Sequence, residues 1–514
     1  MFTARKKPLR IALPIGYKLI SSYMPLSGKK QFVLAIAAIA FLSAGSAWGQ
    51  ALFQPPGANL TYGDVTHGMR AQSASTNPAA AAADMARGDG NGRSGTVISG
   101  AAGIEFGNIQ ELWDFYDEVF GAYKPSDGDV QLPGQLPETK PPGGIDLGDI
   151  WDSLDPDIQD ELRAVADEVA RQAAILALIS VEGYGKAWLA ADAPFVFSQP
   201  RWGGAWTMQL KWSGTSRAFG VVEDIEFDAE EARAAIQDWF DTEVASRPTT
   251  LQVGGQVFLV LDALGSVAFS LQNDSAIAYK ATQTTSLSSG YSRAAWSNDA
   301  GTLYVGGEAH LHNMRLSGLG VRFGDMTDSE ELFDQIRNAD YESDTRISFD
   351  AGVLWVAENY QLGAQLTNLN EPDFQFPDID TDPFTNESII QQFEKGLTYT
   401  MERQLKLEAS LYGRDRKWSW HVGLDANAAS DPVGDEFQWL TLSGGLDTGK
   451  AWLPNLRIGY RQNLAGTEKS YASLGMTMFK YVNIDIASAL STTEIDGRSL
   501  PEGLMLSMGF QINW

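Results

Sequence analysis

The stretch Leu504–Trp514, LMLSMGFQINW, stands at the end of the chain and decides the fold. Apolar residues occupy every second position in it, namely Leu504, Leu506, Met508, Phe510, Ile512 and Trp514. Mostly small or polar residues stand between them, so a strand here has one apolar face and one polar face. Such a strand would promote aggregation at the exposed edge of a soluble sheet. The same strand is favourable as the closing strand of a membrane barrel, with its apolar face toward lipid. The alternative interpretation is a C-terminal edge strand packed on a soluble core.

The same period of two returns repeatedly after residue 205. The segments extend to about 9–11 residues, which is the length that a tilted strand needs to cross a bilayer. The clearest of them are 206–212, 303–312, 347–355, 418–427 and 482–486. Aromatic residues near the predicted strand ends are typical of an interfacial girdle; they are Trp355, Tyr399, Trp418, Trp439, Trp452, Tyr460 and Tyr481. We therefore predict an all-β transmembrane barrel of about 12–14 antiparallel strands.

Residues 1–49 are typical of a secretory signal peptide. Lys29-Lys30 precede an apolar run from Phe32 to Leu42, and Ala47-Trp48-Gly49 offers small residues where a signal peptidase reads. The apolar run is shorter than the roughly 20 residues that span a bilayer, so we expect cleavage near Gly49 rather than an uncleaved anchor. Both Met1 and Met24 are candidate start residues.

The charge and the cysteine count exclude several functions. The chain carries a net charge of −27, and this becomes −34 once the seven basic residues of the predicted signal peptide are removed. A surface this acidic repels nucleic acid, so we expect no direct nucleic-acid binding. Because the chain has no cysteine, it has no disulfide, thiol nucleophile or thiolate metal site.

Composition and hydrophobic periodicity divide the chain into four regions. Residues 1–49 are the signal peptide, and the Gly/Ala-rich residues 50–107 form an N-terminal hatch-like segment and a first strand. Residues 108–200 are a helical insertion with a Pro/Gly linker, and residues 201–514 are the main part of the barrel. We predict an amphipathic helix over 155–179 and helical loop insertions over 228–244 and 327–338, because each begins at a good N-cap.

The segment Val257–Leu271 departs from strict alternation. Its odd positions are apolar or glycine, and its even positions mix apolar and polar residues. If the odd face meets lipid, part of the lumen is apolar there, as in a plugged barrel or one with an apolar pocket. The alternative is a register shift or bulge.

Three polar groups of residues could carry chemistry. Glu308, His310 and His312 share the strand face assigned to the lumen, and two histidines two residues apart can chelate zinc or copper; the alternative is ordinary polar lining. Asp378, Asp380 and Asp382 begin like a calcium loop but lack its glycine and its final glutamate, which leaves an acidic solvated loop or one that binds divalent cations loosely and bridges lipopolysaccharide. Ser419, His421 and Asp425 have the residue types of a hydrolase triad and nothing more, so we predict no catalytic residue and no cofactor.

Several motifs resemble known barrel families. The Asn77-Pro78-Ala79 triplet, after Thr76 and a Gly/Ala-rich start, resembles the Asn-Pro-Ala motif of the fatty-acid transporter (FadL-like) barrels, which fold an N-terminal hatch into the lumen. The stretches Leu366–Phe374, LTNLNEPDF, and Leu456–Ala465, LRIGYRQNLA, resemble the conjugal transfer TraF-like outer-membrane proteins, and this resemblance covers about residues 58–514. The C-terminal strand, with Phe510, Ile512 and Trp514, resembles the membrane-insertion signal of bacterial outer-membrane barrels.

These resemblances imply a location and two functions. They imply a bacterial outer-membrane protein that contacts lipid and lipopolysaccharide and is inserted by the barrel-assembly machinery. We expect a non-enzymatic envelope component of conjugal transfer, in contact with the conjugation apparatus. The alternative is a FadL-like channel for hydrophobic small molecules. An outer-membrane enzyme is a third hypothesis, with little support among the residues.

Overall fold

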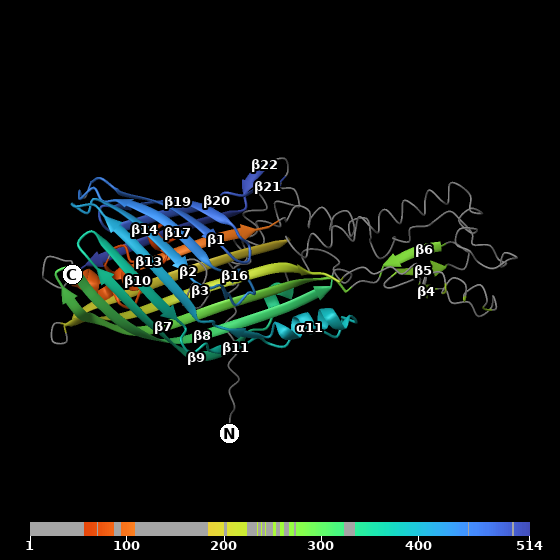
Figure 1. Cartoon of the computed structure of the whole chain (residues 1–514). Helices are drawn as coiled ribbons and strands as arrows, with labels where there is room; N and C mark the ends of the chain where they lie inside the picture. The colour runs from red at the N-terminus through yellow and green to blue at the C-terminus, as the bar shows by residue number, and fades with distance from the viewer. Residues whose placement is uncertain are drawn as a thin grey trace, which may run out of the picture.

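Fourteen antiparallel strands close into one barrel in the computed structural model, with β23 paired to β1 (Figure 1). The structure describes residues 56–68, 70–86, 94–107, 183–199, 203–223, 274–322, 335–450, 452–495 and 498–513, with short pieces at 234, 238, 242, 250–252, 257–261 and 267–271. Within these residues the barrel strands follow one another around the wall in chain order. They are β1 (Gly95–Phe106), β2 (Tyr184–Gln199), β3 (Gly204–Val221), β7 (Ala276–Asn298), β8 (Gly301–Arg322), β9 (Glu342–Val356), β10 (Tyr360–Thr367), β13 (Gln404–Tyr412), β14 (Trp418–Asp425), β17 (Trp439–Leu446), β18 (Asn455–Asn463), β19 (Ser470–Met478), β20 (Val482–Ala489) and β23 (Gly503–Asn513).

The alternation in the sequence decides which side chains face outward. The apolar residues of β23 from Leu504 to Ile512 are 43–55% exposed, whereas Met505 and Ser507 between them are 1% exposed. Other strands of the wall show the same alternation of exposed apolar and buried polar side chains. In β9, for example, Ile347, Phe349 and Val353 face outward and polar side chains face inward. A continuous apolar outer surface is unfavourable in water and favourable in hydrocarbon. The predicted barrel is confirmed, and its strand number lies at the upper end of the predicted range.

The two ends of the barrel differ in their connections. At the end where β23 finishes, strands are joined by short turns such as Asn298–Gly301 and Val356–Tyr360, and we call it the turn end. At the opposite end, the loop end, the connections after β1, β3 and β10 are long. Exposed aromatic residues gather at the turn end, and they include Trp296, Trp418, Trp452 and Tyr481. Tyr399 and Trp439, which were predicted for the girdle, are buried instead because they face the interior.

The wall is also uneven in height. β7 and β8 have 23 and 22 residues, whereas β10, β14, β17 and β20 have eight each. Helix α11 (Glu387–Lys395) packs Ile389 and Phe393 against the tall part of the wall at the loop end. Asn386 caps this helix by accepting hydrogen bonds from two backbone N–H groups of its first turn. The hairpin of β11 (Asp373–Gln375) and β12 (Thr398–Thr400) lies against β9.

Four smaller sets of elements complete the described fold. Three short helices precede the barrel, namely α3 (Asn59–Tyr62), α4 (Arg70–Ala74) and α5 (Ala80–Ala86). Small sheets are formed by β4 (Thr250–Gln252), β5 (Val257–Leu261) and β6 (Val267–Leu271), by β15 (Ala429–Ser430) and β16 (Glu436–Phe437), and by β21 (Thr492–Ile495) and β22 (Arg498–Pro501). No helix among the described residues is long and apolar enough to cross a membrane.

Two sequence predictions are wrong. Val257–Leu271 is not a barrel strand with a mixed lumenal face, because it folds into the β5–β6 hairpin of a separate sheet. The helical insertion predicted over 108–200 extends too far, because Tyr184–Gln199 form β2. The alternation of β2 is weak in sequence, since its outward positions are often Ala or Gly while Trp188 points inward.

Several other predictions fall outside the described residues. They include the signal peptide, the helix over 155–179, nearly all of the helix over 228–244, and Trp514. Of the helix predicted over 327–338, residues 335–338 are described and are helical.

Candidate functional site

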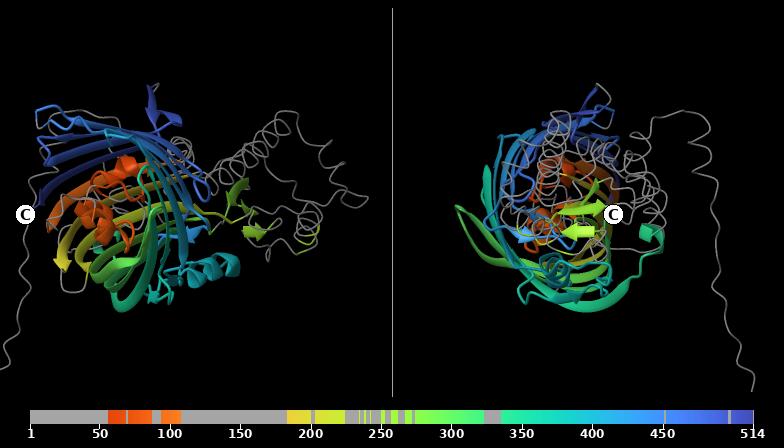
Figure 2. Two further views of the ribbon diagram at one scale, coloured as in Figure 1. Left: turned by 60° about the vertical axis from the view of Figure 1, so that its left-hand side comes forward. Right: turned by 90° about the vertical axis from the view of Figure 1, so that its right-hand side faces the viewer.

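Residues 56–86, which we call the lumenal segment, lie inside the barrel (Figure 2). Helices α3, α4 and α5 belong to this segment, and most of its side chains are fully buried. α3 lies against β17–β20, α4 against β1 and β2, and α5 against β3 and β7–β9. The segment therefore contacts nearly the whole circumference of the wall.

The Asn77-Pro78-Ala79 triplet sits where the lumenal segment turns into α5. Asn77 Oδ1 accepts a hydrogen bond from the Ala79 amide at 2.9 Å, and its backbone oxygen accepts one from Ala80 at 2.9 Å. Asn77 Nδ2 donates to Glu408 Oε1 on β13 at 3.0 Å. One asparagine thus both shapes the turn and fixes it to the barrel wall.

Glu408 joins two distant parts of the lumenal segment. Besides Asn77, it accepts hydrogen bonds from the backbone amide of Thr66 and from Thr66 Oγ1, the latter at 2.9 Å. One side chain of the wall therefore holds both Thr66 and Asn77 in place. The sequence analysis did not single out Glu408, although its place at an inward position of β13 was a usable signal.

Glycines in the wall let the lumenal segment approach closely. A Cβ added to Gly306 on β8 would overlap the backbone of Pro78, and one added to Gly352 on β9 would overlap the side chain of Asn77. A Cβ on Gly459 in β18 would overlap the backbone of Thr61. These positions require glycine because another backbone or side chain occupies the space of a Cβ.

Charged pairs hold the segment as well. Asp64 forms an ion pair of 2.6 Å with Lys406 on β13. Burial raises the pKa of the Asp64 carboxyl, but the cations Lys406, Arg461 and Lys211 together lower it by more, so the pKa lies below its usual value. Thr61 Oγ1 donates to Asp485 at 2.5 Å, and Arg457 binds the same carboxylate through two hydrogen bonds of 2.7 Å.

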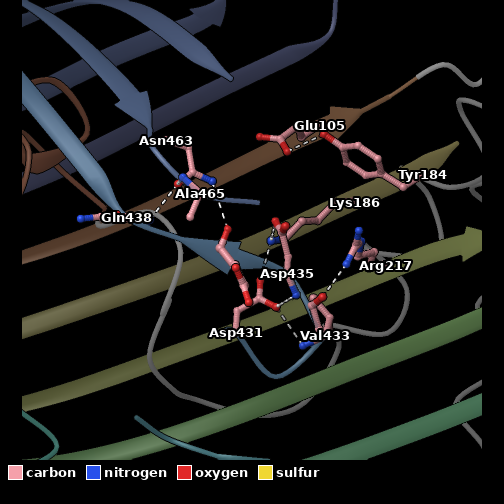
Figure 3. Close-up of polar contacts among 12 residues, drawn as sticks. Glu105, Tyr184, Lys186, Arg217, Asp431, Val433, Asp435, Gln438, Asn463 and Ala465 are labelled. Carbon is pink, nitrogen blue, oxygen red and sulfur yellow. Dashed lines mark hydrogen bonds and ion pairs between the residues drawn. The ribbon is translucent and has the colours of Figure 1, made fainter. Parts of the chain in front are cut away.

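A second element closes the lumen near the loop end. Residues 426–438, between β14 and β17, carry β15 and β16 and form what we call the inward loop. Lys186 on β2 forms ion pairs with Asp431 at 2.5 Å and Asp435 at 2.8 Å, and Arg217 Nη1 on β3 donates to the Gly434 oxygen at 2.7 Å (Figure 3). β2 and β14 are seven places apart in the ring of fourteen strands, so this loop crosses the lumen.

The tip of the inward loop is shaped by the same carboxylates. Asp431 Oδ1 accepts hydrogen bonds from the amides of Val433 at 3.1 Å and Asp435 at 2.9 Å. The side chains of Lys186 and of both aspartates are at most 3% exposed. A buried ion cluster of this kind tolerates the loss of one partner poorly, because the remaining charge has neither water nor a counter-charge.

A cavity of about 110 Å³, which we call the chamber, lies between the two closures. Pro56 and Thr76–Pro78 of the lumenal segment line one part of it, and Ser430 and Phe437 of the inward loop line another. Five carboxylates and two lysines also line it, namely Asp64, Asp192, Glu308, Asp350, Glu402, Lys211 and Lys406. The chamber is therefore polar and acidic.

The predicted set Glu308, His310 and His312 faces the lumen and lines the chamber, as expected from the strand period. His312 Nδ1 is 2.6 Å from Ser286 Oγ, and its Nε2 is 2.8 Å from Ser348 Oγ. The two imidazole rings stack at 5.5 Å between centroids. In the described part of the chain, no group of three or more His, Asp or Glu residues is arranged to hold a metal. Metal binding by His310 and His312 alone is not tested by this arrangement and stays a prediction.

The other candidate groups do not assemble into sites. Both ring nitrogens of His421 lie on serine hydroxyls, at 2.7 Å from Ser410 and 2.9 Å from Ser419. Asp425 accepts a hydrogen bond from the Trp439 amide instead, so the Ser-His-Asp relay is not formed. In the loop before α11, Asp380 accepts from the Asp382 amide at 3.1 Å, which is a local turn contact.

Phe510 and Ile512 of the predicted insertion signal point outward on β23. Their placement at the outer surface fits a contact with lipid or with another protein during insertion, which stays a prediction.

Among solved structures, the chain is similar to the TodX deltaS2S3 mutant monoaromatic hydrocarbon channel, with 9% identity, a TM-score of 0.40, and coverage of 90% of this chain and 100% of that one. It is also similar to a Pseudomonas aeruginosa FadL homologue, with 14% identity, a TM-score of 0.31, and coverage of 90% and 99%. No curated protein sequence matches it. A protein-family match spans residues 74–425, more than half of the chain, and the chain therefore belongs to the family described as F plasmid transfer operon, TraF, protein.

Proposed function

We propose that this protein is a non-enzymatic outer-membrane β-barrel that serves as an envelope component of conjugal transfer and whose lumen is normally shut. The observation that carries the proposal is the double closure of the lumen, by the lumenal segment and by the inward loop. A barrel closed in two places, with charged groups buried in both closures, is suited to a gated or structural role rather than to free diffusion. Membership of the TraF family supports the link to conjugation.

Three features support the outer membrane as the location. The outer face is apolar along the strands, and the turn end carries exposed aromatic residues. Short turns at one end and long connections at the other are typical of barrels with the turns in the periplasm. The contact with lipopolysaccharide, the assembly by the barrel-insertion machinery and the absence of direct nucleic-acid binding are parts of this proposal.

Deletion of the gene in a donor strain tests the role in transfer. We expect the mating frequency to fall by at least about tenfold and to recover with the wild-type gene on a plasmid. Normal transfer in the deletion strain would refute the conjugal role while leaving the barrel itself untouched.

Planar-bilayer conductance of the protein purified from outer membranes tests the closure separately. We expect a silent, heat-modifiable protein. A steady cation-selective current from the wild-type protein would contradict the shut lumen and would indicate an open porin.

A channel for hydrophobic small molecules is the second candidate, favoured by the way Asn77 and Pro78 position the lumenal segment against the wall. In that case Asn77→Ala should abolish uptake of an apolar compound by whole cells. The acidic lining of the chamber makes a purely apolar solute a poor fit, which is why we place this candidate second.

A further inference from the structure

We propose that the chamber binds a small organic cation with an ammonium head group. The inference concerns a binding site in the lumen and is independent of any role in conjugal transfer. Four features of the chamber carry it, namely its charge, an unpaired imidazole nitrogen, its aromatic lining and its size.

The charge of the lining favours a cation. Two lysines face five carboxylates, and the ion pair between Lys406 and Asp64 neutralises one of each. Lys211 is then the single remaining lysine, and the remaining carboxylates are Asp192, Glu308, Asp350 and Glu402. An anion would meet net repulsion here, whereas a cation would replace the water that these carboxylates lose by burial.

His310 supplies an independent sign of a missing donor. The residue is 4% exposed, and its Nε2 lies 3.2 Å from Asp350 Oδ2. Both ring nitrogens are buried and neither makes a well-formed hydrogen bond to a described residue, so Nε2 has only the Asp350 contact and Nδ1 has no polar partner. When Nε2–H faces the carboxylate, Nδ1 of the neutral ring is an acceptor. A donor on the ligand, such as the hydroxyl group of choline, would satisfy it, and Glu308 from the same strand face would balance the charge of the ligand.

Aromatic side chains complete the chemistry. Tyr399 and Phe437 line the chamber from β12 and β16, whereas Glu308 and His310 line it from β8. An ammonium group is attracted to the face of an aromatic ring and to a carboxylate at the same time. A bare metal ion prefers a set of three or more oxygen or nitrogen ligands, and no such set exists in the described residues.

The size of the chamber restricts the ligand. A volume of about 110 Å³ is of the same order as the roughly 150 Å³ cavity that holds one benzene molecule. The ligand therefore has only a handful of heavy atoms, as choline does, and the hydroxyl group of choline supplies the donor for His310 Nδ1.

Equilibrium dialysis of the full-length purified protein against labelled choline tests the inference. This method suits a shut lumen, because slow entry of choline delays the equilibrium but does not change it. We expect one saturable site per chain. The neutral isostere 3,3-dimethylbutan-1-ol should compete at least about tenfold more weakly than unlabelled choline, since it lacks only the charge. Equal competition by this alcohol, displacement of choline by low concentrations of Ca²⁺, or no saturable binding would each overturn the proposal.

Substitutions locate the site. Glu308→Gln and His310→Phe should each weaken choline binding by at least about tenfold, because they remove the charge and the acceptor. Glu371→Gln is the matched control, since that carboxylate pairs with Arg403 at 3.0 Å outside the barrel and should bind choline normally. Heat-modifiable mobility reports the fold of each variant, and Asp192→Asn replaces Glu308→Gln if the latter does not fold. Normal choline binding by folded Glu308→Gln and His310→Phe would overturn the assignment.

Discussion

The lumenal segment and the inward loop both close the barrel, but they are held in different ways. The segment is fitted to the wall over a long distance, through wall glycines and through many hydrogen bonds to residues such as Glu408. The loop is held at its tip by one buried cluster, in which Lys186 meets two aspartates. A fit spread over many contacts weakens gradually when one is lost. A closure held by a single ion cluster is lost almost completely when one charge is removed, because each buried charge depends on the others for its stabilisation.

The difference suggests which closure can move. Release of the lumenal segment breaks contacts with strands all around the wall, from β1 to β20. Release of the inward loop breaks the Lys186 cluster and the hydrogen bond from Arg217, and its carboxylates then regain water. It also breaks the hydrogen bonds from Ser430 to Glu402 and from Asn463 to Glu436, and it unpacks Phe437. We therefore expect the loop to open at a lower cost than the segment once its cluster is disturbed.

The largest effect is expected from Lys186→Met. This change leaves Asp431 and Asp435 buried without a counter-charge, which costs about 3–5 kcal/mol when one partner of a buried pair is removed. The loop should leave the lumen, and proteases should cut within 426–438. Limited proteolysis and planar-bilayer conductance measure this. Lys417→Met is the matched control, because Lys417 pairs with Asp415 at the exposed surface.

Neutralising the whole cluster sharpens the same comparison. The triple variant Lys186→Met, Asp431→Asn, Asp435→Asn leaves neither loop aspartate as an unpaired buried charge, so its loop should resist proteolysis better than that of Lys186→Met alone. If the triple variant is cut as fast as the single one, the ion cluster is not what holds the loop.

A steric change in the wall should have a smaller effect on the lumenal segment. Gly306→Val places side-chain atoms where the Pro78 backbone lies, and overpacking of this kind costs about 1–3 kcal/mol. We expect a lower thermal midpoint and a partial rise in conductance. Gly307→Val on the neighbouring outward position is the control, since an added Cβ there meets only an ordinary contact at 3.7 Å. Equal midpoints for the two variants would show that the close approach of Pro78 contributes nothing.

The sequence predicted the barrel because its signal is local. Alternation needs only a few neighbouring residues, and it correctly assigned the outward side of Phe510 and the inward side of His310. β2 escaped detection because small residues on its outer face remove the contrast between the two faces. The hairpin of Val257–Leu271 was misplaced because its β pattern carries no information about which sheet it joins.

The site was predicted less well for a physical reason. Lys186 and Asp431 are 245 residues apart, and their contact arises from ring closure rather than from any local pattern. Asn77 was singled out through a family motif, whereas its partner Glu408 was not, because a glutamate on an inward strand face resembles ordinary lumenal lining. Only the closed barrel brings these residues together.

The smallest expected effect is a pH dependence of the lumenal segment. His67 stacks on Tyr62 at 4.5 Å, and burial, the neighbouring His421 and Arg457 hold the pKa of its imidazole well below the usual value. The docked segment therefore keeps His67 neutral, whereas the undocked segment takes up a proton near pH 6.5. The contribution of neutral His67 to docking is fully present above about pH 6.5 and is lost as the pH falls below that value. The docking equilibrium constant then falls by up to about tenfold per pH unit.

Conductance at pH 7.5 and pH 5 checks this sign. We expect more frequent openings at pH 5 in the wild type and a flatter response in His67→Gln, which keeps a donor for Asn59 but has no proton to gain. The inward loop should respond less over this range, because it depends on the Lys186 cluster, which contains no histidine. Identical pH profiles for the wild type and His67→Gln would show that another group titrates. The lumenal segment would then not differ from the inward loop through the protonation of His67.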